Sequence, residues 1–257
     1  MPAQESGIDD ASGLLSGRVA AVTGASQGLG EAISRRLVAE GASVALLARS
    51  ADRISALASE LGERAVAIRC DVADAGSVKG AFERISSTFG RLDLLVNNAG
   101  IIGMALLESS SDEHITGQVA TNLVGPILCS RAAIPLMRSA GGGDIVNISS
   151  RSVELARPSL SVYSATKGGL ETFSRTLAAE LRPDKIRVAS IRVGPVATEP
   201  AVQAAGGGSS AVVQDWVARG GPAPEPPASA ESVADAVVFI ATARAGARIP
   251  VVHLEPC

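Results

Sequence analysis

The sequence is poor in aromatic side chains and in the side chains that bind metals. Phe, Trp and Tyr together make up 2% of the chain, which has a single Tyr and a single Trp. The two histidines, His114 and His253, form no HxxxH or HExxH pattern, so the sequence argues against a metal site built by the protein. An aromatic this rare is a poor candidate for ordinary core filling. The lone tyrosine, Tyr163, therefore raises the question of what it does.

Cysteine is also scarce. Cys70, Cys129 and Cys257 are odd in number and far apart, and no CxxC pair is present. This spacing argues against a zinc knot or a disulfide framework. The thiols instead suit a reducing compartment, so we expect a cytoplasmic protein with two buried thiols and one at the terminus.

The chain lacks an excess of charge of either sign and lacks long apolar runs. Its net charge is -3, with acidic and basic residues mixed along the chain, which argues against nucleic-acid or polybasic membrane partners. No apolar run approaches the ~20 residues that a membrane span needs. The start is acidic and polar and unlike a signal peptide, so we expect residues 1–16 to form a flexible tail. A small molecule is the expected partner.

Short apolar runs alternate with longer segments of helical period. Apolar strands separated by helices are typical of a parallel sheet covered on both faces. We therefore predict one α/β domain over residues 17–257, a Rossmann-type doubly wound parallel sheet of about seven strands. The expected strands are 18–24, 42–49, 64–72, 91–100, 143–150, 185–193 and 248–256, and the expected helices are 29–41, 52–61, 75–90, 112–139, 161–182 and 232–243.

The stretch 199–228 is rich in Gly, Ser and Pro and separates the sixth strand from the last helix. A long insertion in a compact domain is usually a lid or disordered. We interpret it as a substrate lid, whose middle could form a short amphipathic helix that carries Trp216.

A glycine-rich turn, TGASQGLG, joins the first strand to the first helix. Glycines at this place permit a tight turn and let a pyrophosphate approach the free N–H groups of the helix N-terminus. The spacing is GxxxGxG rather than GxGxxG. The turn predicts cofactor contacts from Thr23, Gly24, Ser26, Gln27, Gly28, Leu29 and Gly30.

The same residues allow a second interpretation. GASQG is also G-x-S-x-G, the nucleophile elbow of serine hydrolases, and His253 follows late in the chain. The elbow would follow the first strand, however, so no earlier strand could supply the second oxyanion donor. A hydrolase would also leave Tyr163 unexplained.

The end of the second strand indicates which nicotinamide cofactor binds. An acid about 20 residues past the glycines binds a free ribose 2′-hydroxyl, whereas an arginine accepts a 2′-phosphate. Here Ala48 stands at that place and is followed by Arg49 and Ser50. A guanidinium and a hydroxyl suit a phosphate, so the sequence favours NADP over NAD.

Four motifs in order, TGASQGLG, NNAG, NISS and YSATK, resemble those of the short-chain dehydrogenase/reductase family over about residues 17 to 198. The resemblance implies an NADP-preferring oxidoreductase of ketones or secondary alcohols. It implies catalytic roles for Asn122, Ser150, Tyr163 and Lys167, with Ser150 rather than Ser149 at the family's spacing before Tyr163. It further implies cofactor contacts from Asp71, Val72, Asn98, Ala99, Gly100, Ile148, Tyr163, Lys167, Gly194, Pro195, Val196 and Thr198.

Three positions depart from the family pattern. Val193 stands where a proline usually precedes the glycine, and the C-terminus lacks the common DGG ending. Gln27 replaces a residue that is basic in many NADP-dependent members. The resemblance also implies a homotetramer or homodimer in which helices 112–139 and 161–182 pair, although the altered C-terminus puts the usual tetramer contacts in doubt.

The four residues suit proton transfer. A free phenol has a pKa of about 10 and is a poor base at neutral pH. Tyr163 and Lys167 share a helix face at i and i+4, so the lysine charge would favour the phenolate. Ser150 would hold the substrate oxygen, and Asn122 would hold a water that links Lys167 to solvent.

The sequence leaves other functions open. A nucleotide-binding regulator or scaffold could use the fold without redox chemistry, although such a protein would be expected to lose the tyrosine or the lysine. An epimerase or dehydratase of the same architecture would be expected to carry a longer substrate domain. Arg157, in the loop after the fifth strand, could bind a charged substrate, but we expect it to be solvated surface.

Overall fold

The structure is a computed structural model that describes residues 13–196, 210–222, 226–244 and 246–255. The strands are β1 (Val19–Thr23), β2 (Ser43–Ala48), β3 (Ala65–Arg69), β4 (Leu94–Asn97), β5 (Gly143–Ser150), β6 (Ile186–Val193) and β7 (Val251–Leu254). The helices are α1 (Gly28–Ala39), α2 (Ala51–Leu61), α3 (Ala75–Phe89), α4 (Asp112–Val119), α5 (Gly125–Ser139), α6 (Ser161–Glu180), α8 (Ser210–Ala218) and α9 (Ala230–Ala241).

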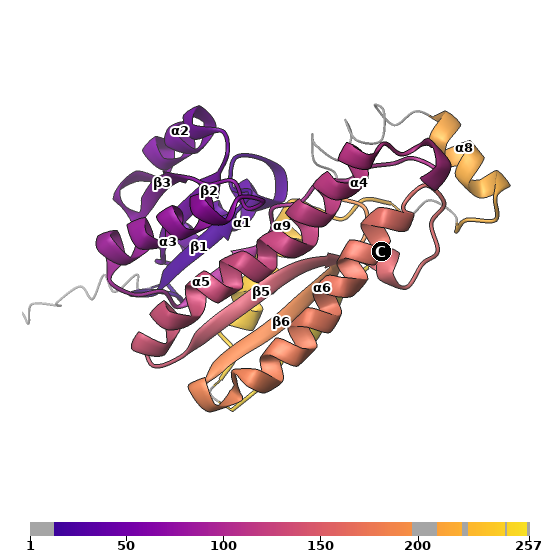
Figure 1. The fold of residues 1–257 in the computed structure, drawn as a ribbon. Helices are drawn as coiled ribbons and strands as arrows, with labels where there is room; N and C mark the ends of the chain where they lie inside the picture. The colour runs from indigo at the N-terminus through magenta and orange to yellow at the C-terminus, as the bar shows by residue number, and fades with distance from the viewer. Residues whose placement is uncertain (1–12, 197–209, 223–225, 245, 256–257) are drawn as a thin grey trace, which may run out of the picture.

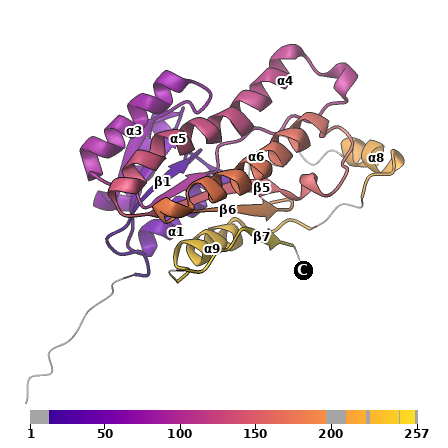
Figure 2. The same ribbon diagram turned by 60° about the horizontal axis from the view of Figure 1, so that its bottom comes forward.

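The seven strands form one parallel sheet in the order β3-β2-β1-β4-β5-β6-β7. Helices α1, α2 and α9 cover one face, and α3, α5 and α6 cover the other (Figures 1 and 2). The strand order reverses between β1 and β4, where a doubly wound sheet opens a crevice at the carboxyl ends of its strands. The predicted fold class is confirmed.

Alternate residues of the central strands supply two hydrophobic cores. Val22 and Val96 pack toward α1 and α9, whereas Ala21 and Leu95 pack toward α3 and α5. Because successive side chains of a strand point to opposite faces, strands buried on both sides are apolar throughout. This is the pattern on which the sequence prediction depended.

The prediction that residues 1–16 form a flexible tail is wrong for the residues nearest the domain. Leu15 is 1% exposed and packs in the core on the α1 side. Its N–H donates to the Glu40 carbonyl at 2.8 Å, while the Leu14 N–H donates to the Glu40 carboxylate at 3.0 Å. Residues 1–12 lie outside the described part of the chain.

The segment expected as one helix over 112–139 is divided by a π-helical turn, Ala120–Val124, between α4 and α5. Within the described residues, this stretch of 28 residues is the one helix long and apolar enough, by length and composition alone, to cross a membrane. A core helix of a soluble protein passes the same test, and α5 contacts β4, β5 and α3. The evidence for a membrane span is therefore weak.

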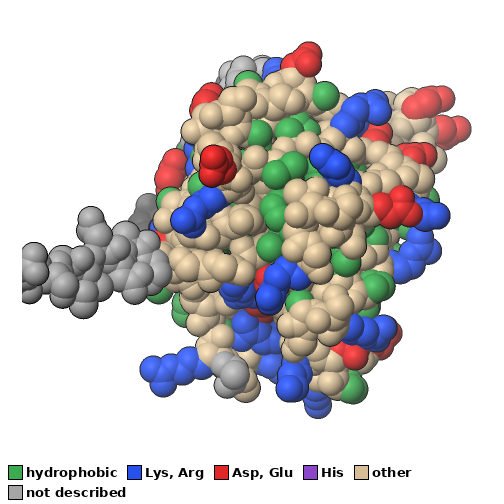
Figure 3. All heavy atoms as spheres, turned by 90° about the vertical axis from the view of Figure 1, so that its left-hand side faces the viewer, with side chains coloured by type: hydrophobic (Ala, Val, Ile, Leu, Met, Phe, Trp, Pro, Cys, Tyr) green, Lys and Arg blue, Asp and Glu red, His purple; other side chains and the backbone are tan. Residues whose placement is uncertain are grey.

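Ion pairs join the amino ends of the strands. Asp144, at the start of β5, is 2% exposed and lies between two guanidinium groups. Its carboxylate oxygens lie 2.9 Å from Arg18 and 2.6 Å from Arg187. Arg91 pairs with Asp93 at 2.6 Å, and Asp93 also accepts the Val19 N–H at 2.9 Å. Figure 3 views the molecule from the side where β5 and β6 begin and shows Lys and Arg side chains gathered in its lower part.

Candidate active site

The glycine-rich turn needs its glycines for two different reasons. Gly24 and Gly28 adopt φ of 67° and 58°, a region that disfavours residues with a Cβ. Gly30 has an ordinary backbone, but a Cβ there would lie 2.1 Å from the Gly24 carbonyl oxygen. The turn and α1 are thus packed too closely for side chains, which leaves the N-terminus of α1 open to a phosphate.

The loop after β4 braces this turn. The Asn98 amide donates to the Thr23 carbonyl at 2.9 Å, and the Thr23 hydroxyl accepts the N–H groups of Asn98 and Ala99 at 3.0 Å each. Asn97 points elsewhere, because its buried amide donates to Asn147 at 2.8 Å. The structure therefore places Asn98 and Ala99 beside the glycine turn and Asn97 within the sheet.

Ser150, Tyr163 and Lys167 come together where β5 ends and α6 begins. Ser150 forms a side-chain hydrogen bond with Tyr163, and its Oγ also accepts the Ser152 N–H at 3.1 Å. Lys167 Nζ lies 5.7 Å from the centroid of the Tyr163 ring and donates to the Ile148 carbonyl at 2.8 Å. One hydroxyl, one phenol and one amine thus face a common space.

Burial opposes the charged forms of both titratable groups. It lowers the pKa of Lys167 to about 8 because the 5%-exposed amine loses its hydration. It raises the pKa of the Tyr163 phenol, while the hydrogen bond with Ser150 and the charge of Arg157 act to lower that pKa. The role of Lys167 as the cation that lowers the phenol pKa stays a prediction, and the groups that lower this pKa in the structure are Ser150 and Arg157. Desolvation weakens the charge of Lys167, and its amine is directed at a backbone carbonyl.

Ser149 and Ser150 point to different neighbours. The buried Ser149 hydroxyl donates to Glu171 on α6 at 2.6 Å, and Glu171 also accepts two hydrogen bonds from Arg192 on β6. Burial disfavours the charged form of Glu171, but these bonds outweigh it and lower the pKa of the carboxyl. Ser149 is thus held within the scaffold, and Ser150 is the serine beside Tyr163.

Asn122 lies in the π-helical turn and is fully buried. Its amide donates to the Ile101 carbonyl and its oxygen accepts the Ile101 N–H, both at 2.8 Å. A Cβ on Gly100 would lie 3.4 Å from Asn122 Oδ1 and 3.7 Å from Lys167 Nζ, so the bare backbone of Gly100 faces both groups. Insertions of π type in helices are frequent at functional sites, and this one places Asn122 against the backbone of Gly100 and Ile101.

The other predicted cofactor residues that the structure describes follow the carboxyl ends of β1, β3 and β6. Ser26 and Leu29 belong to the glycine turn; Asp71 and Val72 follow β3, where Asp71 accepts the Ala73 N–H at 3.0 Å. Gly194, Pro195 and Val196 follow β6, and the Pro195 carbonyl accepts the Ala228 N–H at 2.8 Å. Thr198 and most of the first half of the predicted lid lie outside the described residues.

Arg49 and Ser50 are exposed between β2 and α2, as a phosphate site requires. Sequence reasoning missed Arg53, one turn into α2, whose guanidinium hydrogen-bonds the Gln27 side chain in the glycine turn. The sequence did carry a signal for Arg53, since this arginine lies only four residues after Arg49. Arg53 thus brings a positive charge to the glycine turn, where Gln27 replaces the family's basic residue.

A model of the family described as short chain dehydrogenase matches residues 18–205 of this sequence. The chain belongs to this family. A 3-oxoacyl-[acyl-carrier-protein] reductase of Bos taurus is 40% identical over 182 residues, which are 71% of this chain and 77% of that protein.

Solved structures of this family have the same fold. The 3-ketoacyl-(acyl-carrier-protein) reductase of Brucella melitensis complexed with NADH has a TM-score of 0.83 and 28% identity, and the match covers 94% of this chain and 98% of that one. A metagenomic short-chain oxidoreductase in complex with NADP has a TM-score of 0.78 and 31% identity, covering 95% and 99%. The chain is an oxidoreductase of the short chain dehydrogenase family, whose structural neighbours bind nicotinamide cofactors.

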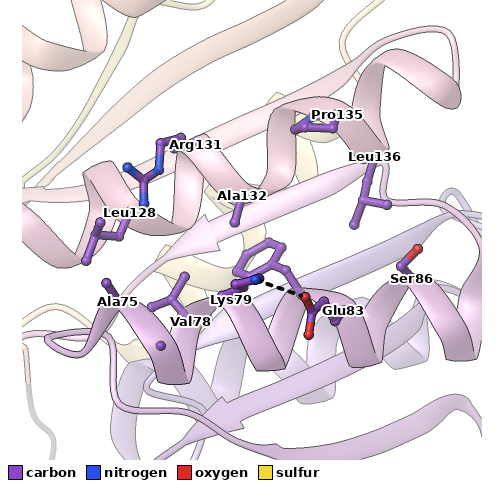
Figure 4. Close-up of a pocket in the computed structure, with 12 residues that line it drawn as sticks. Ala75, Val78, Lys79, Glu83, Ser86, Leu128, Arg131, Ala132, Pro135 and Leu136 are labelled. Carbon is purple, nitrogen blue, oxygen red and sulfur yellow. Dashed lines mark ion pairs between the residues drawn. The ribbon is translucent and has the colours of Figure 1, made fainter.

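A groove of about 590 Å³ between α3 and α5 lies apart from the family's catalytic groups (Figure 4). Its walls are mostly apolar, with an ion pair between Lys79 and Glu83 at 3.8 Å. None of the predicted site residues lines it. Within the described residues, no group of three or more His, Cys, Asp and Glu side chains is placed to hold a metal.

Proposed function

We propose that the chain transfers a hydride between NADP(H) and a ketone or secondary alcohol, with Tyr163 as the acid or base. The observation that carries this proposal is the arrangement of Ser150 and Tyr163 at one end of the sheet, with Lys167 below the phenol. A regulator without redox chemistry would have no need to bury an amine whose pKa burial lowers to about 8.

The nicotinamide cofactor, when bound, supplies or accepts the hydride. The protein supplies the proton and its position. Ser150 Oγ accepts the Ser152 N–H, which fixes the position of the hydroxyl that would hold the substrate oxygen. Tyr163 Oη then gives its proton to the developing alkoxide in reduction, or removes it from the alcohol in oxidation. Asn122 fixes the start of the loop at Ile101 with two hydrogen bonds to its backbone.

Replacing Tyr163 by Phe tests the proton-transfer role. The change removes one oxygen and keeps the ring, so the fold should persist while kcat falls by a factor of roughly 10²–10⁴, the usual contribution of a general acid or base. NADPH absorbance on a panel of ketones, including a 3-ketoacyl thioester, measures the rate. Ser149→Ala is the matched control, because Ser149 contacts Glu171 instead of the phenol. Wild-type turnover in Tyr163→Phe would refute the mechanism.

The preference for NADP rests on two exposed cations, Arg49 after β2 and Arg53, which contacts Gln27. Two guanidinium groups suit the 2′-phosphate. We expect Arg53→Ala to raise KM for NADPH roughly tenfold, about 1.4 kcal/mol of binding, with little change for NADH. Arg35→Ala on α1 is the control, since Arg35 pairs with Glu31 and Glu60. An equal loss with both cofactors, or a wild-type preference for NADH, would contradict this assignment.

The compartment, the assembly and the lid are also proposals. Buried Cys70 and Cys129 suit a cytoplasmic protein, because burial raises the pKa of Cys70 to about 11 and disfavours its reactive thiolate. We propose a homodimer or homotetramer whose subunits pair through α5 and α6, which light scattering of the purified protein would test. The segment 199–228 returns to its start, since Ala228 pairs with Val196, as a lid hinged at the end of β6 would.

A further inference from the structure

Arg192 belongs to a row of polar residues that crosses the last three strands of the sheet. Its partner in register on β5 is Ser149, and its partner on β7 is His253. Each of the three stands one residue before its strand ends. Residues paired in register on neighbouring strands point to the same face of a sheet. Arg192 therefore lies between the end of the strand that carries Ser150 and the last strand.

A buried carboxylate on α6 fixes the Arg192 guanidinium. Its Nε donates to Glu171 Oε1 at 2.8 Å, and its Nη2 donates to Glu171 Oε2 at 2.6 Å. Glu171 is 5% exposed, so this bidentate pair is shielded from water. Two parallel bonds hold the plane of a guanidinium as well as its position. The third nitrogen, Nη1, is left for other partners.

The third nitrogen of Arg192 contacts the loop after β5. Nη1 donates to the Glu154 carboxylate and lies 3.3 Å from His253 Nε2. The Glu154 carboxylate also lies 3.9 Å from His253 Nδ1. One guanidinium on β6 thus joins α6, β7 and this loop, and Glu154 is the residue by which the loop is held.

Glu154 closes a turn that begins at the candidate catalytic serine. The Glu154 N–H donates to the Arg151 carbonyl at 3.0 Å and ends the 3₁₀ turn that follows β5. Within this turn, the Ser152 N–H donates to Ser150 Oγ at 3.1 Å. The Ser150 hydroxyl is therefore oriented by a turn whose far end is bound to Arg192.

Further along, the same loop makes a contact of another kind. The Arg157 guanidinium lies 5.1 Å from the centroid of the Trp216 ring, which is the geometry of a cation–π interaction. Arg157 is half-buried, so the expectation that it is solvated surface is wrong. Glu154 is nearer than Arg157 to Ser150 along the chain, so the bond to Arg192 is the anchor closer to the turn.

We propose that Arg192 is a positioning residue for the reaction: through Glu154 it holds the turn that orients the Ser150 hydroxyl. The proposal rests on the proposed function for its catalytic meaning, because the orientation of Ser150 affects a rate only if a substrate oxygen binds there. Its physical content, a turn held by an ion pair to another strand, can be measured without turnover.

Glu154 is the residue to replace first. Its carboxylate is 41% exposed, and the loss of an exposed ion pair costs a fold little. Glu154→Ala should lower kcat for a ketone roughly tenfold, because a misplaced hydroxyl no longer meets the substrate oxygen. The KM for NADPH should stay at its wild-type value. Glu154→Gln keeps an oxygen that accepts from Arg192 and should restore most of the rate.

Hydrogen exchange followed by mass spectrometry measures the turn directly. In Glu154→Ala, peptides that cover residues 150–156 should exchange roughly fivefold faster than in the wild type, because the turn opens more often. Peptides from α3 should keep their wild-type rate.

A second variant removes the other side of the anchor. Arg192→Met alone would leave the buried Glu171 carboxylate unpaired, so Arg192→Met is combined with Glu171→Leu. This pair of changes should speed exchange in residues 150–156 as Glu154→Ala does. Adding Glu154→Ala to it should give no further increase, since all three changes break one chain of contacts.

Glu60→Gln is the matched control, because Glu60 is 58% exposed and pairs with Arg35 on the face covered by α1 and α2. It should change neither exchange in residues 150–156 nor kcat. Unchanged exchange in Glu154→Ala, or faster exchange with a wild-type kcat, would overturn the proposal. If exchange responds as expected but the wild type turns over no substrate, the proposed function fails and the anchoring of the turn by Arg192 stands.

Discussion

Both ends of the sheet bury a charged side chain, Asp144 at the amino ends of the strands and Lys167 at the carboxyl ends, but of these two described residues only Asp144 is paired with opposite charges. At the amino ends, Asp144 is enclosed by Arg18 and Arg187, which neutralise it. At the carboxyl ends, Lys167 is buried just as deeply, but its hydrogen bond goes to the Ile148 carbonyl. Burial removes the hydration of the ammonium and lowers the pKa of Lys167 to about 8, a loss that a carbonyl offsets less than a carboxylate would. One end stabilises the fold, and the other keeps groups that can exchange protons.

The largest effect on stability should come from removing the buried carboxylate at the amino ends of the strands. Asp144→Ala leaves two half-buried guanidinium groups facing each other and should lower the free energy of unfolding by about 3 kcal/mol, the scale of a broken buried ion pair. Urea denaturation followed by circular dichroism measures it. Asp184→Ala is the control, because its partner Arg138 is 55% exposed and its loss should be much smaller. Equal losses would mean that burial does not distinguish the two pairs.

Removing the buried charge at the carboxyl ends of the strands should change the free energy of unfolding in the opposite direction. Lys167→Met abolishes turnover by hypothesis, yet should raise the free energy of unfolding near pH 7 by on the order of 1–3 kcal/mol, because the cost of burying an ammonium disappears. The pKa of Lys167 is lower in the folded state, so this cost is full below about pH 8 and fades as the pH rises toward the unfolded pKa of 10.5. The advantage of the variant should shrink over that range. A variant less stable than wild type at pH 7 would reverse the comparison.

The smallest effect on stability should come from the exposed ion pair at the amino ends of the strands. Arg91 is 48% exposed and pairs with Asp93, which keeps its bond from the Val19 N–H when Arg91 is lost. Arg91→Gln should therefore cost less than about 1 kcal/mol and leave kcat and KM unchanged. Thermal denaturation and NADPH kinetics on one preparation give both values. A change in kinetics would show that the two ends are not independent.

Much of the fold could be predicted because burial on both faces leaves a clear pattern. All seven strands lie within the predicted segments, yet the predicted strand 91–100 shortens to Leu94–Asn97. Apolar and small residues continue past Asn97, but the Asn98 and Ala99 N–H groups turn to the Thr23 hydroxyl, a contact with another strand that no local pattern reveals. Leu15 joined the core for the same kind of reason, since Glu40 binds the backbone around it.

The sequence by itself determined the order of the elements and the glycine turn, because periodicity and spacing are local properties. The four residues of the candidate site came from the resemblance of its motifs to those of a known family. Tertiary structure decided which charges these residues experience. It directed Lys167 to a backbone carbonyl, placed Arg53 on Gln27 and stacked Arg157 on Trp216. Electrostatic effects depend on distance and burial in space, and residues as far apart as 157 and 216 acquire both only when the chain has folded.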